Sequence, residues 1–145
     1  MKSPAAAPLP ELALPQGAGP LPALRVLTTF ATWCEPCVAE LPELRHLRAS
    51  FPDRDLRLLS VPVDPEDLGA RLERWVRRHT PPYRMLEELP RGDVAAIQEL
   101  LRAELGSEGL PASLVLAADG RVLLARFGAP TVSDLRRLLA VERDE

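Results

Sequence analysis

Apolar and polar residues alternate along this chain in a way that predicts short strands separated by amphipathic helices. Runs typical of β-strands lie at residues 24–30, 56–63, 112–116 and 122–127. Apolar residues recur at helical spacing over residues 35–51, from Asp64 to Val76, over residues 93–105 and from Thr131 onwards. The predicted order is β-α-β-α-α-β-β-α, an α/β arrangement with its helices packed on a central sheet.

Local signals mark where the helices bend and begin. Pro42 has no amide hydrogen and crowds the preceding turn, which predicts a kink in the first helix. Asp64 followed by Pro65 predicts the start of the second helix, because aspartate caps the first turn and proline fits its first position. Residues 64–110 are therefore expected to form a mostly helical excursion between the second and third strands.

The carboxyl-terminal part of the chain predicts a β-hairpin and a final helix. Asp119-Gly120 lies between the last two strand-like runs, and glycine there can adopt the positive φ that a tight turn requires. Thr131 is expected to cap the final helix, with Asp134 completing a capping box.

Composition favours a single globular domain preceded by a leader. The 145 residues are 46% hydrophobic and 27% charged, enough to bury a core without metal or disulfide staples. Six of the 16 prolines fall in the first 23 residues. We therefore expect a proline-rich leader over residues 1–23 and one domain over residues 24–145.

Charge and hydropathy narrow the classes of partner. A net charge of −3 gives no field that would attract nucleic acid or an anionic membrane. The sequence has neither a signal-peptide pattern nor a run of about 20 apolar residues, so it predicts no membrane segment in this chain. The compartment stays open, since an export signal or anchor absent from this chain is the alternative to a cytosolic protein.

The two cysteines lie three positions apart, where the first strand gives way to the first helix. Cys34 and Cys37 can close a small disulfide, with Cys34 at the exposed helix end. Unpaired amide hydrogens and the helix dipole stabilise a thiolate there, so Cys34 is the predicted nucleophile. Cys37, one turn further in, is the predicted resolving thiol, which makes the pair a redox couple.

The two residues between the cysteines are expected to tune this couple. Glu35 places a carboxylate beside the thiolate and raises the thiol pKa, and Pro36 removes an N–H that could donate to sulfur. Both effects disfavour the thiolate, which predicts a reducing couple and hence a protein disulfide reductase. A disulfide-inserting oxidase is the alternative.

Two further classes use cysteines differently. A copper- or zinc-binding module would need ligands beside Cys34 and Cys37, for which the sequence offers His46 or His79 but no second ligand pair. A peroxiredoxin-type peroxidase needs a single reactive cysteine in a proline-led loop, whereas here a resolving cysteine is adjacent. The redox couple is therefore favoured, no metal ligand is assigned, and the metal-binding module stays an alternative.

Residues 30–37, Phe-Ala-Thr-Trp-Cys-Glu-Pro-Cys, resemble the active-site signature of the TlpA/ResA-type thiol–disulfide oxidoreductases in the thioredoxin superfamily. Pro42 falls where the family's helix is kinked, and Gly109-Leu110-Pro111 falls at its cis-proline loop. The resemblance extends over roughly residues 24–141. It implies a thioredoxin fold, a three-layer α/β/α sandwich with a central mixed β-sheet and a helical insertion before the cis-proline loop.

The resemblance also implies residues that bind substrate. Pro111 is expected to be cis and to present the backbone of Leu110 to an extended substrate segment. From its position beside the nucleophile, Trp33 is expected to cover the disulfide and shape the substrate surface; a tryptophan that closes the core after the strand is the competing interpretation.

Proton transfer is where this sequence departs from the thioredoxin pattern. Many thioredoxins carry a buried acid six residues before the first cysteine, where this chain has Thr28. Asp64 or Glu66 is the candidate substitute, since the second strand should end near the active site. Helix capping by Asp64 and a solvated first-turn charge at Glu66 are the competing interpretations.

The resemblance implies protein thiol or disulfide substrates, apocytochrome c among them, and an upstream electron donor. It implies no dissociable cofactor, because the Cys34–Cys37 disulfide is itself the redox group. Members of the family are usually exported or membrane-anchored. We expect a monomer, and the motif does not determine its specific substrate.

Overall fold

The computed structural model describes residues 20–144, so the first 19 residues of the predicted leader lie outside the described part of the chain. The elements follow in the order β1 (Leu24–Phe30), α1 (Glu35–Ala39), α2 (Leu41–Ser50), β2 (Leu56–Pro62), η2 (Pro65–Asp67), α3 (Ala70–His79), β3 (Arg84–Met85), α4 (Arg91–Leu105), β4 (Ala112–Ala117), β5 (Val122–Phe127) and α5 (Val132–Asp144).

The strands form one five-stranded mixed sheet in the order β3-β2-β1-β4-β5. Strands β1, β2 and β3 run parallel, whereas β4 is antiparallel to both β1 and β5. Strand β1 therefore lies at the centre, and all seven of its residues are buried. The central mixed sheet that the resemblance implied is confirmed.

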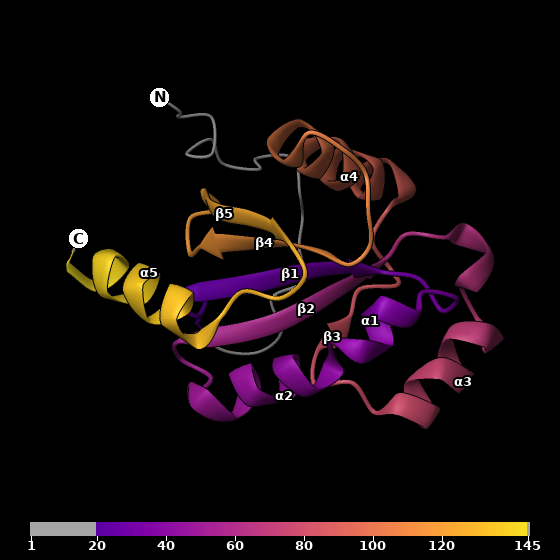
Figure 1. The fold of residues 1–145 in the computed structure, drawn as a ribbon, viewed down its shortest axis with the longest axis horizontal. Helices are drawn as coiled ribbons and strands as arrows, with labels where there is room; N and C mark the ends of the chain where they lie inside the picture. The colour runs from indigo at the N-terminus through magenta and orange to yellow at the C-terminus, as the bar shows by residue number, and fades with distance from the viewer. Residues whose placement is uncertain (1–19, 145) are drawn as a thin grey trace.

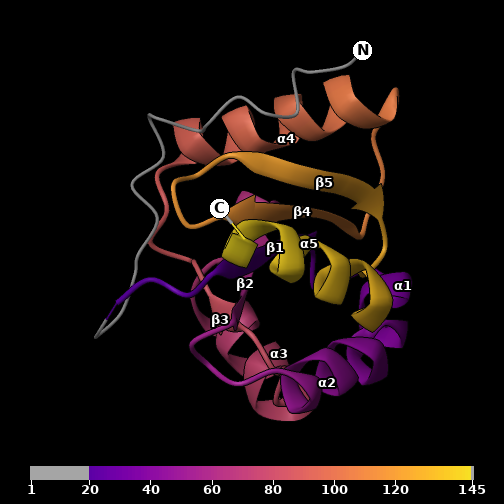
Figure 2. The same ribbon diagram turned by 90° about the vertical axis from the view of Figure 1, so that its left-hand side faces the viewer.

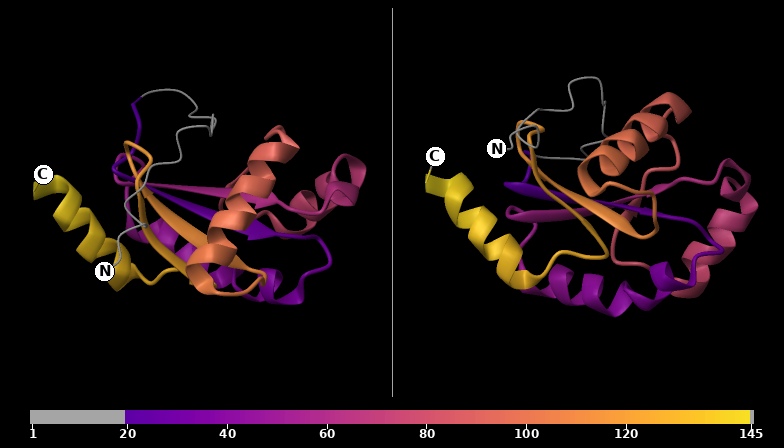
Figure 3. Two further views of the ribbon diagram at one scale, coloured as in Figure 1. Left: turned by 90° about the horizontal axis from the view of Figure 1, so that it is seen from above. Right: turned by 45° about the horizontal axis from the view of Figure 1, so that its top comes forward.

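Helices cover both faces of this sheet. Helix α4 lies across one face, and α1, α2, α3 and α5 lie on the other (Figures 1 and 2). The view from above shows α4 crossing the strands on the face that it covers alone (Figure 3, left). The arrangement is the three-layer α/β/α sandwich that the resemblance implied, with the insertion between β2 and the Leu110–Pro111 bond.

Side chains that alternate in direction along β1 contribute to the hydrophobic core on both faces of the sheet. Leu24, Val26 and Phe30 pack into the cluster beneath α1, α2, α3 and α5, whereas Leu27 packs into the cluster beneath α4. Successive side chains of a strand point to opposite faces, so one strand supplies both cores. The α4 face of the core is completed by residues from one helix, namely Val94, Ile97 and Leu101.

The predicted kink in the first helix is present, but the break precedes Pro42. Helix α1 ends at Ala39, Glu40 lies between the helices, and α2 begins at Leu41. Proline cannot donate to the carbonyl four residues earlier and its ring crowds that carbonyl, so the disruption falls on the preceding turn.

The start of the second predicted helix was wrong. Asp64 does act as a cap, with its side chain accepting from the Glu66 N–H, but it caps only the short 3-10 turn η2. The chain is already extended at Leu68, Gly69 adopts a φ of 91°, and α3 begins at Ala70. Glycine adopts this φ at little cost, which allows the chain to change direction between the two elements.

Strand β3 was not predicted. It consists of Arg84 and Met85 alone and pairs in parallel with Leu59 and Ser60 at the edge of the sheet. Two residues are too few to produce a periodic pattern, so the sequence predicts only a mostly helical excursion between β2 and β4.

The hairpin and the final helix match their predictions. Gly120 adopts a φ of 94° in the turn between β4 and β5. The Asp134 N–H donates to Thr131 Oγ1 at 3.0 Å, and the Thr131 N–H donates to Asp134 Oδ2 at 3.2 Å. The capping box is therefore complete. Within the described residues, no helix is both long and apolar enough to span a bilayer.

Replacing Ile97 by alanine tests the core beneath α4. Ile97 is fully buried within the cluster beneath α4, so its truncation leaves a cavity among closely packed side chains. We expect Ile97→Ala to lower the free energy of unfolding by about 2–5 kcal/mol in chemical denaturation. Val141→Ala is the control, because Val141 is 50% exposed, and its effect should stay within about 0.5 kcal/mol. Equal effects of the two changes would contradict this account of the core.

Candidate active site

The two cysteines form a disulfide at the beginning of α1. Their Cα atoms are 5.3 Å apart, and Cys34 is the N-cap residue, with Sγ accepting from the Cys37 N–H at 3.1 Å. This donor contributes to the stabilisation of negative charge on Cys34, as expected for a thiolate at a helix N-terminus. Cys34 is only 4% exposed and Cys37 only 1%, so the expected exposed sulfur is almost covered in the oxidised protein.

Access to the disulfide is through a cavity of about 810 Å³ that Cys34 lines. One wall comes from the active-site residues, including Trp33, Glu35 and Pro36. Helix α4 and the segment that follows it also line the cavity, with apolar residues (Leu101, Leu105, Leu110) and polar or charged ones (Gln98, Glu99, Arg102, Glu108). Phe127, at the end of β5, adds an aromatic ring. The volume is in the range of pockets that enclose a ligand or several side chains.

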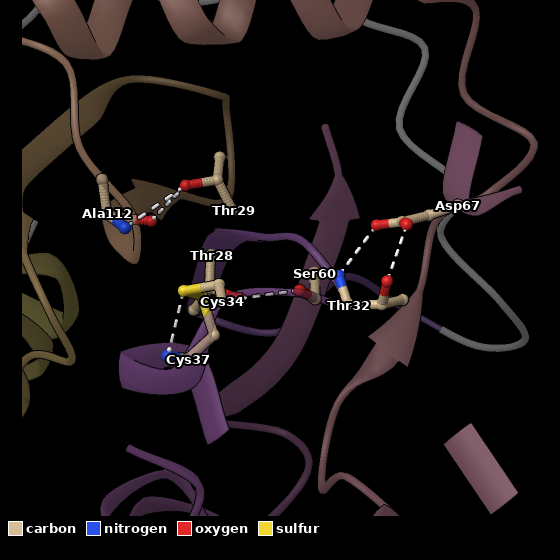
Figure 4. Close-up of a disulfide and its surroundings, with 8 residues drawn as sticks. All are labelled: Thr28, Thr29, Thr32, Cys34, Cys37, Ser60, Asp67 and Ala112. Carbon is tan, nitrogen blue, oxygen red and sulfur yellow. Dashed lines mark hydrogen bonds between the residues drawn. A yellow bond between two sulfur atoms is a disulfide. The ribbon is translucent and has the colours of Figure 1, made fainter. Parts of the chain in front are cut away.

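The cis-proline prediction is confirmed. The Leu110–Pro111 peptide bond is cis, and Pro111 is buried. Leu110 and Ala112, the residues on either side, line the same cavity as Cys34. Ala112 is tied to β1 by two hydrogen bonds, because Thr29 Oγ1 donates to its carbonyl at 3.1 Å and accepts from its N–H at 3.2 Å (Figure 4).

Gly109 allows an aromatic ring to approach the cis-proline loop closely. A Cβ at this position would lie 2.9 Å from Phe127 Cε1, closer than such atoms pack. The ring of Phe127 is 43% exposed and lines the cavity. Glycine therefore shapes this side of the cavity by leaving room for Phe127.

Trp33 stands exposed at the mouth of the cavity but is held in place. Its side chain is 63% exposed, and its indole N–H donates to Asp64 Oδ2 at 2.8 Å. Asp64 Oδ1 accepts from the Glu66 N–H at 2.9 Å. These hydrogen bonds hold the pKa of Asp64 below its usual value, and the bond from the Glu66 N–H contributes more than the bond from Trp33. Asp64 thus anchors the indole, and Glu66 lies exposed beside it.

A second carboxylate from the same turn reaches the residue before Trp33. Asp67 Oδ2 accepts from the Thr32 N–H at 2.8 Å, and Oδ1 accepts from the Thr32 hydroxyl at 2.7 Å (Figure 4). The Asp67 side chain is completely buried. Asp67 was not among the predicted site residues, since a contact over 35 positions leaves no local pattern in the sequence.

Beneath the disulfide, the position of the buried acid in thioredoxins is filled by a hydroxyl. Thr28 is buried and donates to Ser60 Oγ at 2.9 Å, joining β1 to β2 (Figure 4). Ser60 also interacts with the hydroxyl of Tyr83, whose pKa burial raises above its usual value. The charge of Glu40 contributes to the same upward shift, which places Glu40 near this group of hydroxyls.

Glu40 is the acidic residue that the sequence analysis overlooked. Burial raises its pKa from 4.5 to about 7, and its Oε1 is buried without a hydrogen-bond partner in the described part of the chain. Residues three or four apart lie on one helix face, and Glu40 is three after Cys37 and four before Leu44. Both of those neighbours are buried. A glutamate at a position where the helical spacing expects an apolar residue is the sequence signal that could have identified Glu40.

The histidines do not join the cysteines. His46 is exposed on α2, and His79 packs its ring against Trp75 with centroids 4.6 Å apart. Among residues 20–144, no group of three or more His, Cys, Asp or Glu side chains is placed to hold a metal ion. Trp75 itself belongs to the core, since it is 7% exposed and packs on Phe30.

Comparison with known proteins agrees with the resemblance found at residues 30–37. The thiol:disulfide interchange protein CycY of Rhizobium leguminosarum bv. viciae is 30% identical over 113 residues, 78% of this chain and 54% of CycY. The thiol-disulfide oxidoreductase ResA of Oceanobacillus iheyensis is 35% identical over 43 residues, 30% of this chain and 22% of ResA. The chain therefore spans about half the length of CycY.

Solved structures establish the fold. The thiol-disulfide isomerase of Corynebacterium glutamicum superimposes with a TM-score of 0.63 at 16% identity, over 97% of each chain. The shared architecture is that of thioredoxin-like proteins, as the resemblance implied. A family model described as the AhpC/TSA family matches residues 21–125. Most of the described chain lies within this match, and the protein belongs to the AhpC/TSA family.

Proposed function

We propose that this chain is a thiol–disulfide oxidoreductase that reduces disulfides in protein substrates through Cys34 and Cys37. The observation that carries the proposal is the Cys34–Cys37 disulfide at a helix N-terminus, opening onto a cavity of about 810 Å³. A buried structural disulfide would need neither the cavity nor the exposed indole of Trp33 beside it. The names of CycY and ResA describe the same chemistry in those relatives.

The first step is attack by reduced Cys34. Its thiolate forms a bond to one sulfur of the substrate disulfide, and the bond between the two substrate sulfurs breaks. The substrate's other sulfur leaves as a thiolate and takes up a proton. The cavity places the substrate beside Cys34, with Trp33 and Leu110 on its walls. The product is a mixed disulfide between the protein and its substrate.

The second step is attack by Cys37. Its thiolate forms a bond to Cys34 Sγ, and the bond from Cys34 to the substrate sulfur breaks, so the substrate leaves as a dithiol. Two electrons have passed to the substrate, and the protein holds its disulfide. An upstream dithiol donor must then reduce that disulfide, and no dissociable cofactor takes part.

Glu40 is our candidate for the base that deprotonates Cys37. It lies one helical turn after Cys37, and its pKa of about 7 suits a group that exchanges protons near neutral pH. The earlier candidates, Asp64 and Glu66, are placed differently. Asp64 is engaged with Trp33 and has a lowered pKa, and Glu66 is exposed, whereas Oε1 of Glu40 is buried and Glu40 is close to Cys37 in sequence, so we favour Glu40.

The direction of electron flow follows from how weakly the Cys34 thiolate is stabilised. One N–H, from Cys37, donates to its sulfur. Pro36 has no N–H to add, and Glu35 contributes a negative charge in the first turn of α1. A poorly stabilised thiolate favours the disulfide form of the protein and hence a reducing couple. These observations support a reductase over a disulfide-inserting oxidase.

The cavity indicates the kind of substrate. The leucines and Phe127 in its lining suit a bulky apolar side chain near the target disulfide of a protein, and Glu99 and Arg102 beside them suit polar groups of the same segment. Apocytochrome c is a candidate that the resemblance suggests. We propose that the chain acts as a monomer on such substrates, together with an electron donor on another chain.

Substitution of the second cysteine should trap the intermediate. In Cys37→Ser the mixed disulfide forms at Cys34 but cannot be resolved, so incubation with insulin, a protein with accessible disulfides, should give a covalent adduct on non-reducing gels. Dithiothreitol should release it. Cys34→Ser is the matched control and should give no adduct. Equal trapping by both variants would exclude Cys34 as the nucleophile.

The reduction potential tests the direction of electron flow. Titration against a dithiol buffer, with tryptophan fluorescence as the readout, should give a value close to that of thioredoxin, about −270 mV. A value close to about −120 mV would show that the couple is oxidising and would favour the disulfide-inserting oxidase.

Replacement of Glu40 by glutamine should flatten the pH dependence of the second step. In the native protein we expect resolution of the mixed disulfide to accelerate as pH rises through about 7, where Glu40 loses its proton. Glu40→Gln should remove this rise and slow resolution at pH 8 by roughly 100-fold, as measured by rapid quenching. Glu43→Gln, an exposed residue on α2, is the control.

Glu40→Gln also changes how the free energy of unfolding depends on pH. The folded protein keeps the Glu40 proton up to about pH 7, whereas the unfolded chain releases it near pH 4.5. The contribution of neutral Glu40 is therefore complete below pH 4.5 and is lost as pH rises to 7. Relative to Glu40→Gln, the native protein should lose roughly 2–3 kcal/mol of unfolding free energy across this range. Parallel pH profiles would contradict the raised pKa.

A further inference from the structure

Asp67 is a buried carboxylate to which the proposed reaction assigns no role. Its side chain is 0% exposed, although the element that carries it, η2, is only three residues long. Both carboxylate oxygens accept hydrogen bonds from Thr32, two residues before the nucleophile Cys34. Figure 4 shows the two bonds bridging η2 and the loop that leads to α1.

Burying a carboxylate is costly unless it is paired and hydrogen-bonded. Asp67 meets this condition mainly through Thr32, whose N–H and hydroxyl lie 2.8 and 2.7 Å from its oxygens. The Arg71 guanidinium lies 3.7 Å away, but its side chain is 54% exposed and the distance exceeds that of a hydrogen bond. The principal contacts of this buried charge are therefore made to the active-site loop.

Apart from Asp67, this loop is tied to the same turn through the indole of Trp33, which donates to Asp64 Oδ2 at 2.8 Å. The loop joins the end of β1 at Phe30 to the start of α1 at Glu35, and within it the Cys34 N–H donates to the Ala31 carbonyl at 3.1 Å. Thr32 lies in the middle of this turn and is held at its backbone and its side chain by Asp67. Fixing Thr32 thus fixes the segment that carries Cys34.

We propose that Asp67 is a positioning residue that holds Cys34 Sγ in place for bond formation with Cys37. Reacting groups held in the correct geometry have a high effective concentration toward each other. The two hydrogen bonds to Thr32 restrict the loop and raise the effective concentration of the two sulfurs. This inference rests on the proposed oxidoreductase function, and it assigns to the turn after β2 a share in setting the redox equilibrium.

The equilibrium for closing the Cys34–Cys37 disulfide tests the proposal, because that equilibrium is insensitive to stability as long as the protein stays folded. We expect Asp67→Ala to lower the effective concentration of the sulfurs about tenfold, which raises the potential by about 30 mV for two electrons. Titration against a dithiol buffer below the unfolding transition measures this shift.

Asp67→Asn separates position from charge. The asparagine carbonyl can accept from the Thr32 N–H, and its amide can donate to the Thr32 hydroxyl, so the tie is kept while the negative charge is lost. We expect the equilibrium constant for disulfide closure in Asp67→Asn to stay within a factor of two of the native value. A shift as large as that of Asp67→Ala would show that the charge acts rather than the position, and would overturn the proposal.

Asp55→Ala is the matched control for loss of a buried carboxylate. Asp55 is 7% exposed, pairs with Arg143, and lies just before β2, at the opposite end of the strand from η2. It should lower stability and leave the potential unchanged. Equal shifts for Asp55→Ala and Asp67→Ala would overturn the positioning role.

Two further measurements keep the test decisive. If Asp67→Ala does not fold, Thr32→Val removes one of the two hydrogen bonds and should shift the equilibrium about threefold; no shift would overturn the proposal. Turnover of insulin by the native protein is measured in parallel. A native protein that closes its disulfide reversibly but reduces no substrate would contradict the proposed function, while the Asp67 comparison would still stand.

Discussion

Strand β1 is closed on every side, because β2 and β4 pair with its two edges and helices cover both of its faces. A strand in this position cannot shift its register without moving buried side chains of both cores to the wrong face. Its carboxyl end is therefore a fixed point, and the chain reaches the disulfide four residues later. The geometry of the redox couple depends on this strand.

Three threonines transmit that rigidity from the strand to the site. Thr28 bonds to Ser60 of β2, Thr29 bonds to Ala112 at the start of β4, and Thr32 bonds to Asp67 of η2 (Figure 4). Each hydroxyl joins the segment before Cys34 to a different element. Such a set of neutral donors is well suited to a buried site, since it satisfies polar groups and adds no charge of its own.

The sequence predicted what local chemistry determines. The Thr131–Asp134 capping box joins residues three apart, and the cysteine pair is likewise contained in one helical turn. Asp67 lies 35 positions from Thr32, so its role depends on how the chain folds back after β2. The start of α3 at Ala70 was missed for a similar reason. Gly69 adopts a positive φ because of how the surrounding elements pack, which the local sequence does not show. Glu40 could have been found from its spacing to Cys37 and Leu44.

The cavity is built from two regions of the chain that are far apart in sequence. Residues 34–37 contribute the disulfide end of the cavity, whereas α4, Leu110 and Phe127 contribute a wall of mixed apolar and polar side chains. Substitutions in that wall leave the residues between the cysteines untouched. Descendants of such a chain can therefore acquire new substrates by changing one surface of a helix and a loop while they inherit the electron chemistry intact.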